Sequence, residues 1–343
     1  MPIPTEPIGS VPRPAYLLAD ITDAALVDKA LTETIAEFTA TGSPVVTDGE
    51  QGKSSFATYP LAGLTNLGPD GAVIPFADGH TRQLPALTAG PFRYGDYAVT
   101  HYQRARGLTE LPVKQAVIAP SALSLLYPAD GIDGYSREQF LADLADEAEK
   151  DIRQCLEAGA HSVQLDFTEG RLSLKLDPSG GVLDAFIALN NQVLDRFSDA
   201  KRARIGVHTC PGGDQDSVHS LDIDYADLLP KLFTLHVGAF YLQLASEPDP
   251  ERVLAIAAEH LPEGARLFVG VTDPIDPAVE TDEQVRDRVL AAARHIPVDR
   301  LGTCDDCGFS PFADDTSTSR ETAFAKVAAR VRGTALAAEQ LGV

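Results

Sequence analysis

Eight short apolar segments, separated mostly by stretches with helical periodicity, constrain the fold of this chain most strongly. Each is typical of a buried strand, and they are marked by Ile8, Val46, Ile118, Leu165, Val207, Leu242, Val269 and Leu301. Amphipathic helices are predicted at 24–38, 137–158, 183–197, 225–235, 251–259, 282–295 and 319–341. This alternation predicts an α/β fold, a (β/α)8 TIM barrel, with an open doubly wound sheet as the alternative.

The region from about 56 to 100 breaks the alternation. It is rich in Gly, Pro and Thr and contains short alternating runs such as 72–76. This pattern predicts a β-hairpin excursion from the barrel. No internal repeat, low-complexity tract or evident linker interrupts the rest, so residues 1–343 are expected to form a single domain.

The composition restricts the partners of the chain. Its 343 residues are 44% hydrophobic and 23% charged, as in ordinary globular proteins. A formal net charge of -22 disfavours binding to nucleic acid or to anionic membranes. The sequence has no transmembrane run, no signal peptide, and too few cysteines for a disulfide framework. A cytoplasmic protein is therefore predicted, either a monomer or a homo-oligomer.

Three candidate metal ligands follow predicted strands. His208 and Cys210 end the strand marked by Val207, and side chains two residues apart in extended structure share a face. Cys307 follows a later apolar segment and precedes Gly308. The carboxyl ends of barrel strands meet at one rim, so these side chains could form a three-ligand Zn2+ site with an open fourth position. The alternative is a core histidine beside inert buried thiols.

Acidic and small residues reach the same predicted rim. Asp48 and Glu50 follow the second strand, where they could bind an ammonium group or a metal, or simply form a turn. Asp166 ends the fourth strand. Near the start of the chain, Gly9 allows close approach of a ligand and Ser10 offers hydrogen-bond donors, although the segment taken alone favours an ordered N-terminal arm.

The remaining cysteines and two histidines have simpler interpretations. Cys304 and Cys307 form a C-x-x-C pair, in which Cys304 is either a further ligand or a small strand residue. Cys155 is predicted to fill the core from an amphipathic helix. His219 and His236 are predicted to be surface or packing residues.

Five motifs together resemble the catalytic half of the cobalamin-independent methionine synthases. They are Ile8-Gly9-Ser10, Asp48-Gly49-Glu50, Gln164-Leu165-Asp166, His208-Thr209-Cys210 and Cys307-Gly308, and the similarity runs in order across nearly the whole chain. The resemblance implies a (β/α)8 barrel that uses a zinc-bound thiolate to take a methyl group from a folate. It implies that His208, Cys210 and Cys307 bind zinc. It also implies that Ile8, Gly9, Ser10, Glu50 and Asp166 hold the amino-acid part of homocysteine, with Glu50 and Asp166 as the catalytic carboxylates.

The sequence departs from this family in three places. The family's fourth zinc ligand is a glutamate, and Gln243 stands at that position, with Glu247 or Cys304 as alternatives. A histidine that follows the seventh strand in the family is missing from 271–276. The chain also lacks the family's additional N-terminal barrel and its folate-stacking tryptophan, since it has no Trp. The expected methyl donor is therefore either a folate or a methylated corrinoid protein.

The sequence thus predicts zinc-dependent methyl transfer to a thiol, with conversion of homocysteine to methionine as the leading case. One alternative is alkyl transfer to a different thiol, such as a coenzyme thiol that opens an epoxide. Another is a barrel that binds zinc or a small molecule without turnover. Only an enzyme would yield a thioether from a thiol and a methyl donor.

Overall fold

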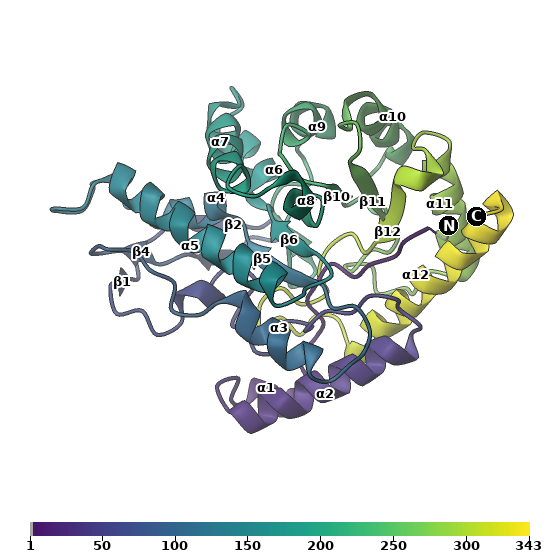
Figure 1. The fold of residues 1–343 in the computed structure, drawn as a ribbon, viewed down its shortest axis with the longest axis horizontal. Helices are drawn as coiled ribbons and strands as arrows, with labels where there is room; N and C mark the ends of the chain where they lie inside the picture. Colours follow the sequence, from purple (N-terminus) through teal and green to yellow (C-terminus); the bar gives the residue numbers. More distant parts are fainter. Residues whose placement is uncertain (1–2) are drawn as a thin grey trace.

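The protein, described by a computed structural model over residues 3–343, has a parallel sheet enclosed by a ring of helices (Figure 1). Six neighbouring strands run in the order β12-β11-β10-β7-β6-β5, and every adjacent pair is parallel. Their bounds are β5 (Gln115–Ile118), β6 (Val163–Asp166), β7 (Ile205–Thr209), β10 (Ala239–Leu242), β11 (Arg266–Gly270) and β12 (Leu301–Cys304). Nearly all of their residues are buried, as expected for parallel strands covered by helices.

Two further segments close the sheet into a ring. Single parallel bridges join them to its two edges, Thr5 to Thr303 and Val46 to Val113. The two segments also meet each other, because the Thr47 hydroxyl donates to the Gly9 carbonyl over 2.8 Å. The first two predicted strands therefore complete the (β/α)8 barrel, and the open doubly wound alternative is not the fold.

Helices cover the outside of the ring. The longer ones are α2 (Ala24–Ala40), α3 (Ala98–Arg106), α5 (Arg137–Glu157), α6 (Glu169–Leu176), α7 (Gly181–Leu194), α9 (Tyr225–Leu232), α10 (Pro250–His260), α11 (Asp282–Ala293) and α12 (Arg320–Leu341). Short turns are α1 (Ala15–Leu18), α4 (Pro120–Leu123), α8 (Asp199–Arg202), η1 (Tyr59–Leu61), η2 (Ser124–Leu126) and η3 (Val298–Arg300). All seven predicted helices are present, and capping boxes at Ser136 and Thr281 fix the starts of α5 and α11.

The sequence did not predict α3 or α6. Both are short, with nine and eight residues, so they contain too few turns to display a clear apolar period. Glu169, the first residue of α6, therefore lies on a helix that the sequence did not reveal.

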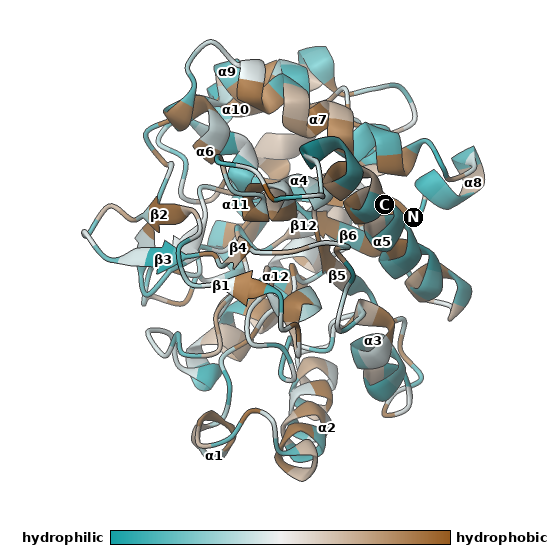
Figure 2. Cartoon of the chain, turned by 90° about the vertical axis from the view of Figure 1, so that its left-hand side faces the viewer, coloured by the Kyte–Doolittle hydropathy of each residue, from teal (hydrophilic) through white to brown (hydrophobic). Residues whose placement is uncertain are grey.

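The predicted β-hairpin excursion is present as two nested antiparallel pairs. β1 (Leu67–Gly68) pairs with β4 (Ala86–Leu87), and β2 (Val73–Pro75) pairs with β3 (Thr81–Gln83). A second small hairpin, β8 (Gly213–Asp214) and β9 (Ser217–Val218), follows β7. The Ala77 amide donates to the Val218 carbonyl over 3.0 Å, so the two hairpins meet. Figure 2 shows β2 and β3 on the side of the molecule opposite to α8 and the two chain ends.

The interior of the barrel contains a small apolar cluster of its own. Ile8, Tyr241, Phe268 and Cys304 form it, and the rings of Tyr241 and Phe268 stack with centroids 4.5 Å apart. Cys155 is also fully buried, in the main core, as predicted.

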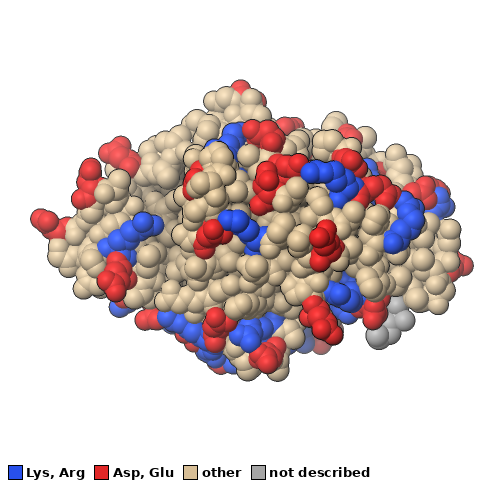
Figure 3. Space-filling model, turned by 90° about the horizontal axis from the view of Figure 1, so that it is seen from above, with Lys and Arg blue, Asp and Glu red and all other residues tan. Residues whose placement is uncertain are grey.

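Charged side chains of both signs are mixed over the face of the molecule that Figure 3 presents. Within residues 3–343, none of the helices combines the length and the apolar character needed to cross a membrane.

Candidate active site

Three side chains from two strand ends meet at one rim of the barrel. His208 and Cys210 come from the end of β7, and Cys307 comes from the loop after β12. Their ligand atoms all lie within 4.8 Å of one another, and the two sulfur atoms are 3.2 Å apart. This is the convergence that the sequence predicted.

The backbone around this cluster orients the ligand atoms. His208 Nδ1 lies 3.3 Å from the Tyr241 carbonyl, so the tautomer with a proton on Nδ1 donates there. His208 Nε2 is then left with a lone pair, and this buried atom has no hydrogen-bond partner in the described chain. The Gly212 amide donates to Cys210 Sγ over 3.4 Å, which fixes the position of this sulfur. An orphaned imidazole nitrogen beside two thiols is the donor set that Zn2+ prefers.

The pKa of the Cys307 thiol and the short distance between the two sulfur atoms also favour a bound cation at this cluster. The hydrogen bond with Cys210, together with burial, raises the pKa of the Cys307 thiol well above its usual range. Two thiolates this close would repel each other strongly without a positive charge between them. A divalent cation held by His208, Cys210 and Cys307 would offset that repulsion and favour the thiolate form of its sulfur ligands.

The three candidates for a fourth ligand lie outside this cluster. Gln243 is buried, and its Oε1 accepts hydrogen bonds from Arg171 Nη1 at 2.9 Å and Tyr225 at 3.2 Å. Glu247 forms an ion pair with the same guanidinium at 2.8 Å. Cys304 packs in the apolar cluster inside the barrel. Gln243 as a ligand stays a prediction, and it requires these hydrogen bonds to rearrange.

Across the rim from the thiols, Glu50 and Asp48 follow the second barrel segment. Glu50 has φ 57°, a left-handed conformation that is uncommon outside glycine and common at functional sites. Its carboxyl group is buried, and burial raises its pKa to about 7 in spite of the nearby Lys53 ammonium. Glu50 Oε2 has no partner within residues 3–343, whereas Asp48 accepts a bond from the Glu50 amide.

Asp166 approaches the same space from the end of β6. Its pKa is raised because the carboxyl group is buried. The Gln164 side-chain amide donates to Asp166 Oδ1 at 2.7 Å and to the Ile8 carbonyl at 3.1 Å. One glutamine therefore ties the N-terminal segment to this carboxylate.

Ser10 is held against the loop that carries Cys307. Its hydroxyl accepts a hydrogen bond from the Ser310 amide at 3.2 Å. A Cβ at Gly308 would lie 2.2 Å from the Ser10 hydroxyl, so only glycine permits this approach. The Ile8-Gly9-Ser10 segment and the Cys307 loop therefore form one continuous wall.

One pocket brings the two sets of predicted residues together. Of those predictions, Ile8, Gly9, Ser10, Glu50, Asp166, His208 and Cys307 line it. Asp166 of β6 is the register neighbour of His208 of β7, so the carboxyl groups and the metal cluster share this pocket. Cys210 lies behind this surface, within the metal cluster, and Gln243 lines a neighbouring pocket that also touches Cys307.

The structure adds residues that the sequence did not single out. Lys53 is fully buried beside Glu50. His219, expected to be a surface or packing residue, is buried, lines the pocket and contacts the Phe76 ring edge-on. Arg82 of β3 forms an ion pair with Asp214 of β8 over the same space. Arg82 and His219 reach the site through the packing of distant elements, whereas Lys53 lies only three residues after Glu50.

A third, larger pocket borders the first and contains another buried carboxyl group. Glu169 lines it, accepts a hydrogen bond from the Ser121 hydroxyl, and leaves Oε2 without a partner among the described residues. Burial raises the pKa of Glu169 to about 8, so the group is largely protonated at neutral pH. Phe56 and Phe312, whose rings meet edge-to-face at 5.7 Å, line both pockets.

Comparison with known proteins places this site in a family. The family model "Cobalamin-independent synthase, Catalytic domain" matches residues 64–330. A 5-methyltetrahydropteroyltriglutamate–homocysteine methyltransferase from Nitratidesulfovibrio vulgaris is 27% identical over 331 residues, covering 89% of this chain but only 38% of that protein. A methionine synthase from Pyrococcus furiosus is 22% identical over 326 residues, covering 89% of this chain and 86% of that protein.

Solved structures agree with the fold. A B12-independent methionine synthase from a Shewanella species superimposes with a TM-score of 0.79 at 21% identity, covering 99% of both chains. A putative vitamin-B12-independent methionine synthase from Listeria monocytogenes gives a TM-score of 0.67 at 19% identity, covering 97% of both. Since the family match extends over most of the chain, the protein belongs to the family of cobalamin-independent synthase catalytic domains, whose named relatives are methyltransferases.

Proposed function

We propose that this protein is a zinc-dependent methyltransferase that converts homocysteine to methionine. The observation that carries the proposal is one pocket with two chemically distinct walls. One wall has the His208 imidazole and the Cys307 thiol, which form a cluster with Cys210, and the other has the carboxyl groups of Glu50 and Asp166. Homocysteine carries a thiol and an ammonium group at its two ends, so it complements both walls at once.

Each wall has a separate task in this proposal. His208, Cys210 and Cys307 would hold Zn2+, which lowers the pKa of a bound thiol so that the substrate sulfur reacts as a thiolate. Glu50 and Asp166 would bind the substrate ammonium group. The Ile8-Gly9-Ser10 wall would face the substrate carboxylate. Together they would fix the sulfur in one orientation toward the donor.

The third pocket, which Glu169 lines, is where we propose that the methyl donor enters. Its wall contains Phe56, Phe312 and apolar side chains of α4 and η2, with the protonated Glu169 as a hydrogen-bond donor. Such a chamber suits a flat, polar-edged heterocycle, and on this basis we propose a folate as donor. A methylated corrinoid protein is the competing donor and is tested beside it.

Isotope-labelled methyl transfer tests this function. Zinc-loaded protein is incubated with homocysteine and a CD3-labelled donor, either methyltetrahydrofolate with one or three glutamates or methylcobalamin, and products are measured by mass spectrometry. The proposal predicts trideuterated methionine from one donor and none with Cys307→Ser. Absence of methionine with every donor, from protein that holds zinc and binds homocysteine, would contradict it.

A further inference from the structure

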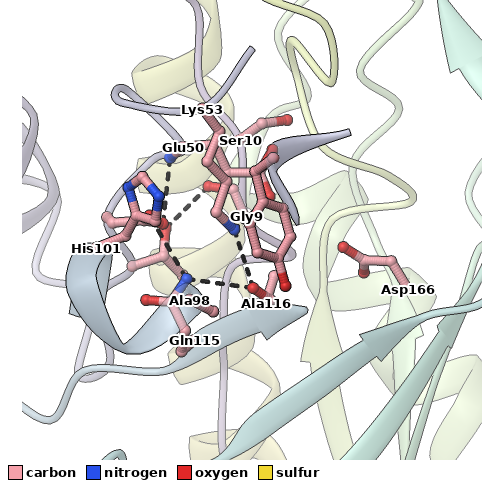
Figure 4. Close-up of polar contacts among 12 residues, drawn as sticks. Gly9, Ser10, Glu50, Lys53, Ala98, His101, Gln115, Ala116 and Asp166 are labelled. Atoms are coloured by element: carbon pink, nitrogen blue, oxygen red, sulfur yellow. Dashed lines mark hydrogen bonds and ion pairs between the residues drawn. The ribbon is translucent and has the colours of Figure 1, made fainter. Parts of the chain in front are cut away.

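A buried lysine lies directly beside Glu50, and neither the metal nor the proposed reaction uses it. The Lys53 side chain is 0% exposed, and its Nζ is 3.5 Å from Glu50 Oε1. The same nitrogen donates to the Ala116 carbonyl of β5 at 2.9 Å and lies 4.5 Å from the centre of the Tyr59 ring (Figure 4). A fully buried ammonium group is costly unless it is paired, so this placement is specific.

The two oxygens of Glu50 have different surroundings. Lys53 faces Oε1, whereas Oε2 is buried and has no partner within the part of the chain that the structure describes. Glu50 itself lines the pocket. The lysine therefore fixes one oxygen and leaves the other free for a ligand.

The charges around Glu50 leave room for one more cation. Glu50, Asp48 and Asp166 supply three carboxyl groups, and Lys53 and Arg13 are the two cations that face Glu50. Arg13 is occupied by backbone oxygens, including that of Glu50 at 2.8 Å. On the far side of Lys53, Asp151 is already held by the Tyr59 hydroxyl and the Ala98 amide. Lys114 and His208 also act on Asp166, so the buried oxygen of these three carboxyl groups without a hydrogen-bond partner in the described residues is Glu50 Oε2, where an ammonium group could bind.

We propose that Lys53 is a positioning residue that holds Glu50 with one oxygen turned to the pocket and thereby selects thiols that carry an ammonium group. The proposal rests on the function proposed above, in which Glu50 receives the amino group of the substrate. It assigns the preference for an amino-acid thiol to a residue that contacts no substrate.

Binding measurements with two thiols test this role without a methyl donor. Calorimetry on zinc-loaded protein compares homocysteine with 4-mercaptobutyrate, which lacks only the amino group. In the parent, homocysteine is expected to bind more tightly. Lys53→Met should weaken homocysteine binding about tenfold and change 4-mercaptobutyrate binding less than about twofold.

Lys114→Met is the matched control. Lys114 is also fully buried and lies 3.5 Å from a glutamate, Glu6, but its Nζ donates to the Pro7 carbonyl, and neither Lys114 nor Glu6 lines the pocket. Its removal should lower stability without changing the preference between the two thiols. If Lys53→Met does not fold, Lys53→Gln gives the same comparison, with zinc content reporting an intact site.

The outcomes separate this proposal from the proposed function. A parent protein that binds both thiols equally would overturn the assignment of the ammonium site, and the role of Lys53 with it. A parent that prefers homocysteine, with the same preference in the Lys53 variant, would overturn the role of Lys53 alone. Equal loss for both thiols would mean that Lys53 only supports the fold.

Discussion

The two walls of the pocket are built in opposite ways. The carboxylate wall is held by the protein itself, since Lys53 pairs with the Glu50 carboxylate, Gln164 donates to Asp166, and Arg13 donates to the Glu50 backbone carbonyl. The metal wall has no internal cation, and it leaves His208 Nε2 without a partner and two sulfur atoms 3.2 Å apart. This difference is what we expect if, as proposed, the first wall binds the substrate and the second holds a metal.

The largest expected effect comes from breaking the metal wall. Cys210→Ser or His208→Ala removes a ligand, so we expect zinc content to fall far below one per chain and methyl transfer to fall to roughly a thousandth or less. Elemental analysis and the labelled-methionine assay measure the two effects. Circular dichroism should show an intact barrel, because the remaining core is unchanged.

Cys155→Ser is the control for thiol loss as such. Cys155 is buried in the main core and is not part of the metal cluster. The Cys155→Ser variant should therefore keep its zinc. Full zinc and activity in Cys210→Ser, or loss of zinc in Cys155→Ser, would show that the ligand assignment is wrong.

Breaking the carboxylate wall should have a smaller and different effect. Glu50→Gln removes the charge that would meet the substrate ammonium, so homocysteine should bind about ten- to a hundredfold more weakly. Zinc content should stay at the parent level, because Glu50 is not part of the metal cluster. Calorimetry and elemental analysis on one preparation check both statements, and parallel loss of zinc and binding would contradict the separation of the two walls.

Glu169 differs from Glu50 because it is a buried carboxyl group with no ion-pair partner among the described residues, whereas Glu50 pairs with Lys53. Burial raises the pKa of Glu169 from 4.5 to about 8. The stability that its protonated form contributes is complete below pH 4.5 and is lost as the pH rises through 8. Over that interval Glu169 should lower the free energy of unfolding by up to about 1.4 kcal/mol for each pH unit.

Glu169→Gln should remove this slope, because an amide does not ionise. Urea unfolding of the zinc-loaded parent and variant between pH 5 and pH 9 measures the difference. Identical slopes for the two proteins would mean that Glu169 titrates in its ordinary range.

The smallest expected effect concerns the hairpin above the pocket. Arg82 forms ion pairs with Asp214 and Asp314 and lies over the Phe312 ring at 4.2 Å. Arg82→Ala should loosen residues 73–83, seen as faster hydrogen exchange, with at most a few-fold change in substrate binding. Arg93→Ala, which removes an exposed ion pair with Asp143, should leave exchange in 73–83 unaltered.

The barrel could be predicted from the sequence because the patterns that indicate its strands and helices are local. Each strand is a short apolar run, and each long helix has several turns of periodic apolar residues, so the order of elements can be found from the chain alone. The first and last residues of the helices and strands were predicted less well. The helices α3 and α6 were not predicted, because segments of eight or nine residues show little periodicity. The excursion was found from its turn residues, but its pairing was not.

The metal wall was also predictable, for the same reason. His208 and Cys210 share one strand end, and the barrel geometry places Cys307 on the same rim. By contrast, the roles of Lys53, Glu169 and Arg82 depend on which side chains pack against them. Lys53 meets Ala116 from a strand 63 positions later, and Arg82 meets Asp214 across 132 positions. Contacts over such separations leave no pattern in the neighbouring sequence.

X-ray absorption at the zinc edge, with and without homocysteine, tests the central claim most directly. The account predicts zinc bound by two sulfur atoms and nitrogen or oxygen ligands in the protein alone, with a third sulfur at about 2.3 Å once homocysteine binds. The 4-mercaptobutyrate analogue should give the same third sulfur only at higher concentration. A sulfur count that stays at two in protein saturated with homocysteine would contradict the account, because the substrate thiol would then bind away from the metal.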